Sequence, residues 1–288
     1  MTTTTRPEVG QSIEANGIRT NYLEAGSGTE KVVLIHGSGP GVSAYSNWRL
    51  VLPALGEDFH VLAPDMVGFG FSDRPADVEY NVQTWADQTV GFMDAMGIEK
   101  AHLVGNSFGG AIALRIATQH PERVDDLVLM GSMGVDFPIT EGLDAVWGYE
   151  GTIESMRGVL DFFAYSRDLV NEELAQVRFK ASTEPGFQES FSSMFPAPRQ
   201  RWVDAMTSPE DEIRKLPHRA LVMHGREDKV IPVENSYKLE SLIDNADLAV
   251  FSHCGHWSMI ERTADFNRLV RDFFLGQPTK PVITTSDE

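Results

Sequence analysis

The stretch LVGNSFGGAIAL, residues 103–114, joins two different sequence patterns. It opens on the apolar run of a buried strand and closes on apolar residues at helical spacing. Between them lies Gly105-Asn106-Ser107-Phe108-Gly109, which has the form G-x-S-x-G. Glycines are needed where a chain turns so sharply that side chains would clash, and such a turn lifts the serine hydroxyl above the strand end. The stretch therefore predicts a strand, a tight turn that presents a nucleophile, and a helix.

Other apolar runs extend this strand into a sheet. They alternate with helical patterns, of which one ends before Gly97 and another covers residues 266–274. Continuous apolar runs favour parallel strands that are covered by helices on both faces, so we predict a doubly wound α/β sheet. The pair Asn16-Gly17 also predicts an opening hairpin. The predicted strands are residues 12–16, 18–25, 31–36, 60–65, 101–106, 126–131, 220–225 and 248–252.

The alternation of strands and helices stops between residues 135 and 204. This segment carries aromatic and aliphatic residues but no convincing strand pattern. We interpret 135–204 as a helical cap inserted into a core made of residues 1–134 and 205–276. Residues 277–288 are polar and contain proline, which predicts a flexible tail.

The composition of the 288 residues excludes several classes of function. A net charge of −18 argues against nucleic acid and anionic membranes as partners. No run of 18 apolar residues and no signal peptide is recognisable, and a single cysteine excludes an internal disulfide. No Cys/His cluster has the spacing of a zinc site. We therefore expect a cytoplasmic protein with no metal and no cofactor.

A serine nucleophile needs a histidine base, and the histidine needs an acid to orient it. Where a sheet carries such a site, the acid follows a late strand and the histidine follows the last one. Glu227 and Asp228 follow the strand predicted at 220–225, and His253 and His256 follow the one at 248–252. We favour Asp228 and His256, with Glu227 and His253 as the alternatives.

A glycine-rich loop, HGSGPG at residues 36–41, follows the first central strand. Such a loop could cradle a phosphate, but neither of the common phosphate-binding patterns is completed. We interpret it instead as one half of an oxyanion hole, in which the backbone N–H groups of Ser38 and Phe108 face each other.

Taken together, five segments resemble a known family. They are LIHGSGPGVSAYSNWR (34–49), APDMVGFGFSDRP (63–75), VGNSFGG (104–110), HGREDKVIP (224–232) and SHCGHW (252–257). The chain resembles α/β-hydrolases with a helical cap, and more narrowly the meta-cleavage product hydrolases of bacterial aromatic degradation. The resemblance covers about residues 10–275 and implies a mostly parallel, eight-stranded sheet.

The resemblance also implies a reaction. These enzymes add water across a carbon–carbon bond of a 2-hydroxy-6-oxohexa-2,4-dienoate, giving 2-hydroxypenta-2,4-dienoate and a small carboxylic acid. The chain looks most like the branch that acts on muconic semialdehydes and small alkyl-substituted ring-fission products. A serine esterase or lactonase with the same triad is the alternative, and a catalytically inactive ligand receptor on this fold is a third. The family suggests a homo-oligomer, a dimer or larger.

The resemblance carries roles onto individual residues. Without it, Arg178 would be read as a solvated helix arginine, Trp257 as a structural aromatic, and the expected pocket walls as ordinary core. The implied roles are a triad of Ser107, Asp228 and His256; oxyanion donors Ser38 and Phe108; dienoate contacts Gly39, Asn47, Asn106, Arg178 and Trp257; and acyl-pocket walls Met133, Leu143, Trp147 and Val230.

Overall fold

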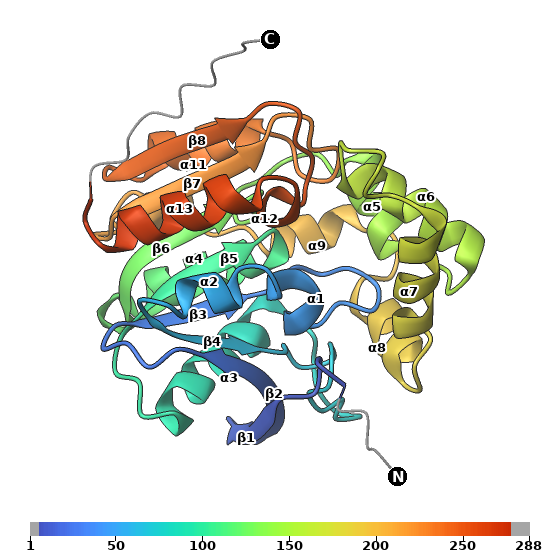
Figure 1. The fold of residues 1–288 in the computed structure, drawn as a ribbon, viewed down its shortest axis with the longest axis horizontal. Coiled ribbons are helices and arrows are strands. Elements are labelled where there is room, and N and C mark those ends of the chain that lie inside the picture. Colours follow the sequence, from blue (N-terminus) through green and yellow to red (C-terminus); the bar gives the residue numbers. More distant parts are fainter. Residues whose placement is uncertain (1–5, 278–288) are drawn as a thin grey trace.

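An eight-stranded sheet runs through the middle of the molecule in the order β1-β2-β4-β3-β5-β6-β7-β8 (Figure 1). The computed structural model describes residues 6–277, so the predicted tail after Gln277 lies outside the described residues. The strands are β1 (Gln11–Ala15), β2 (Ile18–Ala25), β3 (Lys31–Ile35), β4 (His60–Pro64), β5 (Ala101–Asn106), β6 (Val124–Met130), β7 (Ala220–Gly225) and β8 (Ala246–Phe251).

The pairing of the strands confirms the predicted fold class. Strand β2 is antiparallel to both β1 and β4, whereas every other neighbouring pair is parallel. Asn16 and Gly17 form the predicted hairpin turn, with φ values of 50° and 75°. Both central residues of such a two-residue turn need positive φ, which Asn and Gly adopt most readily.

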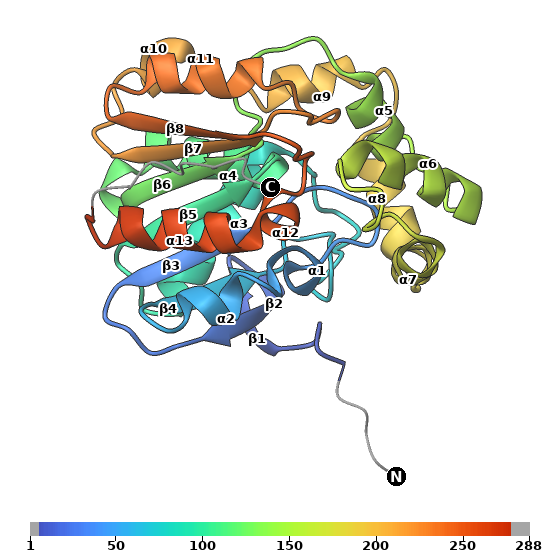
Figure 2. The same ribbon diagram turned by 45° about the horizontal axis from the view of Figure 1, so that its top comes forward.

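Helices cover both faces of the sheet. The core on one face contains residues of α3 (Val82–Ala95), α4 (Phe108–Gln119) and α11 (Glu234–Leu242). The core on the other face contains residues of α1 (Ala44–Trp48), α2 (Leu52–Leu55), α12 (Ser258–Glu261) and α13 (Thr263–Phe274). Figure 2 shows the sheet between α11 and α13. Because both faces are covered, the parallel strands are mostly apolar, which makes them recognisable as apolar runs in the sequence.

The helices of residues 135–204 gather at one side of the molecule, beyond the carboxyl ends of the parallel strands (Figures 1 and 2). The segment contains no strand. Side chains of Thr140, Thr152 and Asn171 cap the first three helices by accepting a backbone N–H. Between β6 and β7 the chain forms α5 (Glu141–Trp147), α6 (Ile153–Phe163), α7 (Glu172–Ser182), α8 (Phe187–Met194), α9 (Gln200–Ala205) and α10 (Glu210–Ile213).

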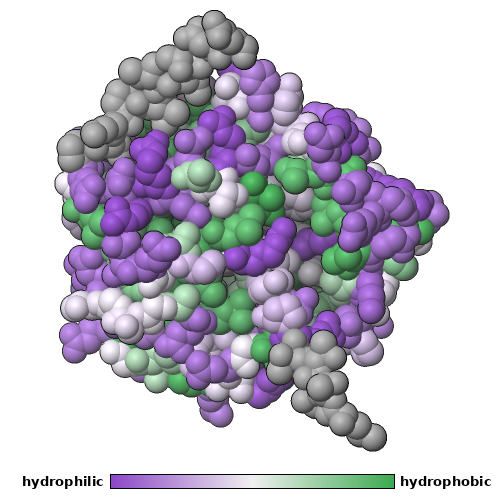
Figure 3. All heavy atoms as spheres, viewed as in Figure 1, coloured by the Kyte–Doolittle hydropathy of each residue, from purple (hydrophilic) through white to green (hydrophobic). Residues whose placement is uncertain are grey.

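The surface of the molecule is mixed in polarity. On the face drawn in Figure 3, hydrophilic residues predominate, and apolar residues gather near the middle and beside the helices of 135–204. Among residues 6–277, no helix combines the length and the apolar character needed to cross a membrane.

Candidate active site

Ser107 sits in a strained turn between β5 and α4. Its φ of 55° and ψ of −115° lie outside the regions that non-glycine residues ordinarily adopt. Its N–H donates to the Met130 carbonyl at 2.9 Å, and its own carbonyl accepts from Gly110 and Met133 at 3.0 Å each. These bonds hold a conformation that would otherwise cost about 1–3 kcal/mol, and such strain concentrates at functional sites.

Two glycines make this turn sterically feasible. A Cβ atom on Gly105 would lie 2.4 Å from the Gly109 carbonyl oxygen, and one on Gly109 would lie 2.2 Å from the Ile35 carbonyl oxygen. Both distances are far inside van der Waals contact with backbone, which cannot move aside. The G-x-S-x-G pattern is therefore explained by close backbone approach between β3, β5 and α4.

Asp228 and His256 are in direct contact although 28 residues separate them in the sequence. His256 Nδ1 lies 2.7 Å from Asp228 Oδ2, while Asp228 Oδ1 accepts backbone N–H groups of Val230 at 2.7 Å and Ile231 at 3.0 Å. Burial by itself raises the pKa of Asp228, but the charge of His256 and the hydrogen bonds of His224 and His256 outweigh burial and hold that pKa well below its usual range. Asp228 is therefore a carboxylate that can orient His256.

The alternative acid and base lie elsewhere. The Glu227 carboxylate accepts the backbone N–H of Cys254 at 3.0 Å and pairs with Arg226. The backbone of His253 has a φ of 53°, and its ring lies 5.4 Å from the ring of Tyr165. Glu227 thus stabilises the loop that carries the histidines. Neither Glu227 nor His253 borders the small cavity that Ser107 and His256 line.

Ser107 and His256 line the same small cavity, whose volume is about 20 Å³. Among residues 6–277, no hydrogen bond joins the Ser107 hydroxyl to His256, so the two side chains share a cavity without being paired. The cavity is lined by Gly37, Ser38, Gly39, Val42, Asn47, Asn106, Ser107, Leu143, Val146, Phe163, Arg178, Val230, His256 and Trp257.

Two backbone donors flank the serine. In the described part of the chain, neither the Ser38 N–H nor the Phe108 N–H is used in a hydrogen bond. His36 fixes the loop of Ser38, because its Nε2 accepts the Met66 N–H at 2.9 Å and its Nδ1 donates to the Gly37 carbonyl at 2.8 Å. Burial lowers the pKa of His36 to about 4, so the ring is neutral near pH 7. The arrangement leaves two free N–H groups able to receive an oxyanion.

Two asparagines beside the serine are only half satisfied. Asn47 Oδ1 accepts the Gly37 N–H at 3.0 Å and the Asn106 amide at 3.2 Å. The remaining ends, Asn47 Nδ2 and Asn106 Oδ1, are buried and have no partner among the described residues. One free donor and one free acceptor therefore border the small cavity, and they can bind a polar ligand without breaking an existing bond.

Arg178 reaches the cavity from α7 and is only 9% exposed. Its Nη2 donates to the Pro40 carbonyl at 3.3 Å, its Nε has no partner, and no carboxylate among residues 6–277 pairs with it. Burial and the nearby charge of Arg49 lower the pKa of Arg178 to about 10, while Tyr149 opposes the shift. Because a buried cation is costly without a counter-ion, the site is prepared for an anion.

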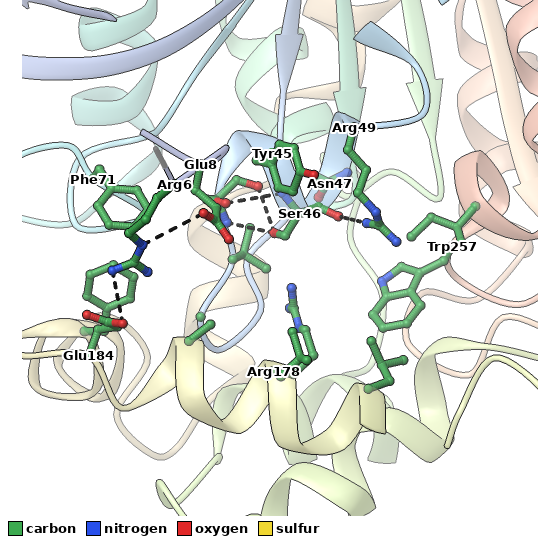
Figure 4. A pocket seen from close by; sticks show the side chains of 18 of the residues that line it. Arg6, Glu8, Tyr45, Ser46, Asn47, Arg49, Phe71, Arg178, Glu184 and Trp257 are labelled. Atoms are coloured by element: carbon green, nitrogen blue, oxygen red, sulfur yellow. Dashed lines mark hydrogen bonds and ion pairs between the residues drawn. The ribbon is translucent and has the colours of Figure 1, made fainter. Parts of the chain in front are cut away.

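A larger cavity of about 280 Å³ adjoins the small one and shares Val42, Asn47, Arg178 and Trp257 with it. Figure 4 shows Arg178 pointing into this space from its helix, with Arg49 and Trp257 on one side and the ion pair of Arg6 and Glu184 on the other. The larger cavity therefore connects the surroundings of Arg178 with the space next to Ser107.

The residues expected around the acyl end divide into two groups. Leu143 and Val230 line the small cavity, whereas Met133 and Trp147 are buried but do not border it. The Trp147 indole donates instead to the Ser38 hydroxyl at 3.0 Å. Its ring also stacks on the ring of Phe195, with 4.3 Å between centroids. Trp147 thus joins the helices of 135–204 to the loop of Ser38.

Phe163 and Val146 also line the cavity, although neither is among the site residues predicted from the sequence. Phe163 stacks on Trp257 with ring centroids 4.7 Å apart, and its carbonyl accepts the His256 N–H at 2.7 Å. No sequence signal distinguishes Phe163 from the other aromatics of its segment. Val146 could have been found, because it lies three residues after Leu143 and so on the same helix face. Within the described part of the chain, no three His, Cys, Asp or Glu residues are grouped as metal ligands.

Comparison with known proteins agrees with this geometry. Residues 31–263 match the family described as alpha/beta hydrolase fold, so the chain is an α/β-hydrolase. It is 59% identical over 267 residues to the 2-hydroxymuconate semialdehyde hydrolase of Pseudomonas sp. strain CF600, covering 93% of this chain and 94% of that protein. It is 53% identical over 275 residues to the 2-hydroxy-6-oxo-2,4-heptadienoate hydrolase of Pseudomonas putida strain F1, covering 96% and 99%.

Solved structures give the same result. A mutant of the meta-cleavage product hydrolase from Pseudomonas fluorescens IP01, complexed with acetates, superimposes with a TM-score of 0.93 at 57% identity, covering 94% of this chain and 99% of that one. The chain therefore belongs to the meta-cleavage product hydrolases, which confirms the resemblance recognised in the sequence.

Proposed function

We propose that this protein hydrolyses the carbon–carbon bond next to the 6-oxo group of 2-hydroxy-6-oxohexa-2,4-dienoates. The products would be 2-hydroxypenta-2,4-dienoate and a small carboxylic acid. The observation that carries the proposal is one cavity that brings together Ser107, the His256–Asp228 pair and the unpaired, buried guanidinium of Arg178. Hydrolysis of a simple ester needs Ser107, His256 and Asp228. A substrate with a carboxylate also needs Arg178 to bind that group.

The carboxylate end of the substrate would bind first. Arg178 supplies a planar guanidinium, which suits two-point contact with a carboxylate. The free Nδ2 of Asn47 can donate to the carboxylate, and the free Oδ1 of Asn106 can accept from the 2-hydroxyl. Trp257 and Gly39 would border the flat diene. Binding of the anion would supply the counter-ion that Arg178 lacks, which gives the substrate a clear orientation toward Ser107.

The reaction would then proceed in two phases. The dienol first becomes a ketone: the 2-hydroxyl loses a proton and C5 gains one, with His256 able to carry it. Ser107, or a water molecule activated by His256, next supplies oxygen to C6. The bond between C5 and C6 breaks, and its electron pair is delocalised onto the 2-oxygen as a dienolate. Protonation of the dienolate gives 2-hydroxypenta-2,4-dienoate. If water attacked, C6 leaves directly as the carboxylic acid; if Ser107 attacked, a water molecule activated by His256 hydrolyses the acyl ester, which releases the acid and regenerates the Ser107 hydroxyl.

The oxyanion that forms at C6 would lie between the free N–H groups of Ser38 and Phe108. Loss of one such donor typically costs about 3 kcal/mol of transition-state stabilisation. Leu143 and Val230 restrict the space around the group attached to C6, and we propose Met133 and Trp147 as further walls behind them. Apolar walls of this kind suit a hydrogen or a small alkyl group at this position.

The names of relatives support the proposal. The proteins with 59% and 53% identity are named for 2-hydroxymuconate semialdehyde and 2-hydroxy-6-oxo-2,4-heptadienoate. The first compound would release formate here and the second would release acetate. The Pseudomonas fluorescens structure with bound acetates supports a small acid as product.

The test compares two substrates on the purified protein. We expect rapid loss of the visible absorbance of 2-hydroxymuconate semialdehyde and of its 6-methyl analogue, and slow turnover of p-nitrophenyl acetate. Consumption of the ester without any turnover of the dienoates would contradict the carbon–carbon hydrolase and favour the esterase or lactonase alternative.

We further propose that the protein acts in the cytoplasm as a homo-oligomer, a dimer or larger, on a small-molecule substrate and without a cofactor. The single cysteine fits a reducing compartment. Size-exclusion chromatography with light scattering measures the oligomeric state directly, and a monomer would contradict that part of the proposal.

A further inference from the structure

Asp228 contacts a second buried histidine, to which the proposed function gives no role. His224, the penultimate residue of β7, places Nε2 3.2 Å from Asp228 Oδ2. This is the same oxygen that meets His256 Nδ1 at 2.7 Å. The side chains of His224 and Asp228 are 0% and 1% exposed, so water does not compete for these contacts.

The neighbours of His224 define where its protons lie. Nε2 lies 3.0 Å from the Ile231 carbonyl as well as near Asp228, and both of these oxygens are acceptors. Nε2 must therefore carry a proton. Nδ1 lies 2.6 Å from the hydroxyl of Ser236, which donates to it when the ring is neutral. His224 consequently donates its N–H to the Ile231 carbonyl and holds the same positive edge of its ring 3.2 Å from Oδ2 of Asp228.

Two imidazoles thus share one carboxylate oxygen. The backbone N–H groups of Val230 and Ile231 hold Oδ1, whereas His224 and His256 are the polar side chains within residues 6–277 that contact Oδ2. They are also the two ionisable side chains whose charges act on Asp228. Without His224, Oδ2 would keep His256 as its single partner, and the rotation of the carboxylate would be less restricted.

We propose that His224 is a positioning residue that fixes Oδ2 of Asp228 toward His256 and takes up part of its negative charge. The inference rests on the triad of the proposed function, and His224 acts through Asp228 without touching substrate. Two consequences follow from electrostatics. Removal of the His224 N–H allows the Asp228 carboxylate to rotate more freely, which lowers kcat. It also leaves His256 as the only side chain that faces the negative charge of Oδ2, which favours the protonated form of His256.

Replacement of the imidazole by an apolar group tests both consequences. In His224→Leu we expect kcat to fall about 10-fold, the effect of losing one close polar contact with a buried charged group. We expect the acidic limb of the pH dependence of kcat/KM to move to higher pH by about half a unit, since a more concentrated negative charge stabilises the protonated base. His224→Gln keeps an N–H near the position of Nε2 and should restore both quantities.

A matched control separates positioning from the loss of any buried histidine. His102 is 4% exposed and also contacts a carboxylate, that of Asp126 at 3.3 Å, but it lies near the start of β5. His102→Leu should leave the acidic limb unchanged. Ser236→Ala keeps the imidazole but removes its second anchor, and should give a smaller shift in the same direction. It also serves if His224→Leu does not fold.

The readouts keep this inference separate from the proposed function. The pH profile is measured with the dienoate and, independently, as the rate at which an organophosphonate labels Ser107. If the unaltered protein is labelled but does not turn over dienoate, the substrate assignment fails while the labelling rates still test His224. A wild-type pH profile in both His224→Leu and Ser236→Ala would overturn the inference, as would failure of His224→Gln to restore it.

Discussion

The two walls of the candidate active site differ in how completely their charged side chains are paired. On the core wall, by which we mean the loops that carry Ser38, Ser107, Asp228 and His256, the Asp228 carboxylate is in contact with four N–H groups from the backbone and from two histidines. On the cap wall, by which we mean helices α5 to α8, Arg178 has one hydrogen bond of 3.3 Å and a buried Nε with no partner among residues 6–277.

The difference indicates that the core wall is built for catalysis and the cap wall for binding an anion. The core wall holds its acid in place before substrate arrives, as a preorganised acid–base group requires, and leaves the oxyanion N–H groups and the free ends of Asn47 and Asn106 open to the substrate. The cap wall is incomplete and stores an unfavourable buried charge, which an anionic ligand relieves. Variants of the core wall should therefore damage chemistry or folding, whereas replacement of Arg178 on the cap wall should damage binding and leave stability unchanged or improved.

The largest effect should come from Ser107→Ala on the core wall. We expect kcat for the dienoate to fall by about 10⁴-fold or more, because loss of a triad nucleophile removes most of the rate enhancement. The dissociation constant of the dienoate should stay within about threefold of the wild-type value, because the dienoate is bound by Arg178 and the asparagines and not by the Ser107 hydroxyl. Stopped-flow absorbance measures both quantities. A variant with more than a tenth of wild-type activity would remove Ser107 from the mechanism.

Gly109→Val should destabilise the core wall strongly. Its Cβ would lie 2.2 Å from the Ile35 carbonyl oxygen, so β3 and α4 would have to separate. We expect a loss of about 3–5 kcal/mol in the free energy of unfolding, the range of severe backbone strain and overpacking. Urea denaturation measures the loss. A Gly109→Val protein of wild-type stability and activity would contradict the geometry of the turn.

The pH dependence of stability should reveal His36, which holds the loop of Ser38. Burial lowers its pKa in the folded state to about 4, whereas the unfolded chain protonates it near its ordinary value of about 6.5. Between these values the unfolded state binds more protons, so stability is lost as the pH falls through this window. The full loss is about 3 kcal/mol below pH 4. His36→Gln keeps an acceptor for the Met66 N–H and should lack this slope in urea denaturation at pH 7 and pH 4.

An identical slope in the unaltered protein and in His36→Gln would show that another group controls acid stability near the site. The comparison has to be made between the two proteins at each pH. Buried Asp65 has a pKa raised by burial to about 6, so its contribution changes over a similar range with the opposite sign. The difference between the proteins cancels the contribution of Asp65 and isolates that of His36.

On the cap wall, Arg178→Met should separate binding from stability. We expect KM for the dienoate to rise about 30-fold, since a charge-assisted contact contributes about 2 kcal/mol. Turnover of p-nitrophenyl acetate should change less than about twofold, and stability should rise by up to about 1 kcal/mol because an unpaired buried charge is removed. The control is Arg157→Met, an exposed arginine of α6 that pairs with Glu172. Equal loss on both substrates would contradict the division between the walls.

The same division explains how much could be predicted from the sequence. The core wall was predictable because its geometry requires particular residues: glycines at 105 and 109, and an acid and a histidine after the last two strands. The apolar runs placed the ends of the strands within one residue, apart from the starts of β6 and β8, which lie two residues earlier than expected. Backbone constraints leave a signature at fixed spacing.

The cap wall left no such signature. Arg178 has the same surroundings in the sequence as a solvated helix arginine, and only the family resemblance singled it out. Phe163 and the tie between Trp147 and Ser38 were not predicted, because they depend on how α5 and α6 approach the sheet. Sequence periodicity identifies the buried face of a helix but does not say which distant loop covers it.

The smallest effect concerns two glycines of the cap helices. A Cβ on Gly158, in the exposed face of α6, would meet no atom within 4 Å, whereas one on Gly142 in α5 would lie 2.2 Å from the Lys229 carbonyl oxygen. Gly158→Ala should therefore raise stability by about 0.5–1 kcal/mol through helix propensity. Gly142→Ala should lower it, because the added atom pushes the cap away from the loop of Asp228. Thermal unfolding measures the change in stability of both variants. A gain for Gly158→Ala with a loss for Gly142→Ala would show that α5 packs tightly against the loop of Asp228, and changes of the same sign would exclude this.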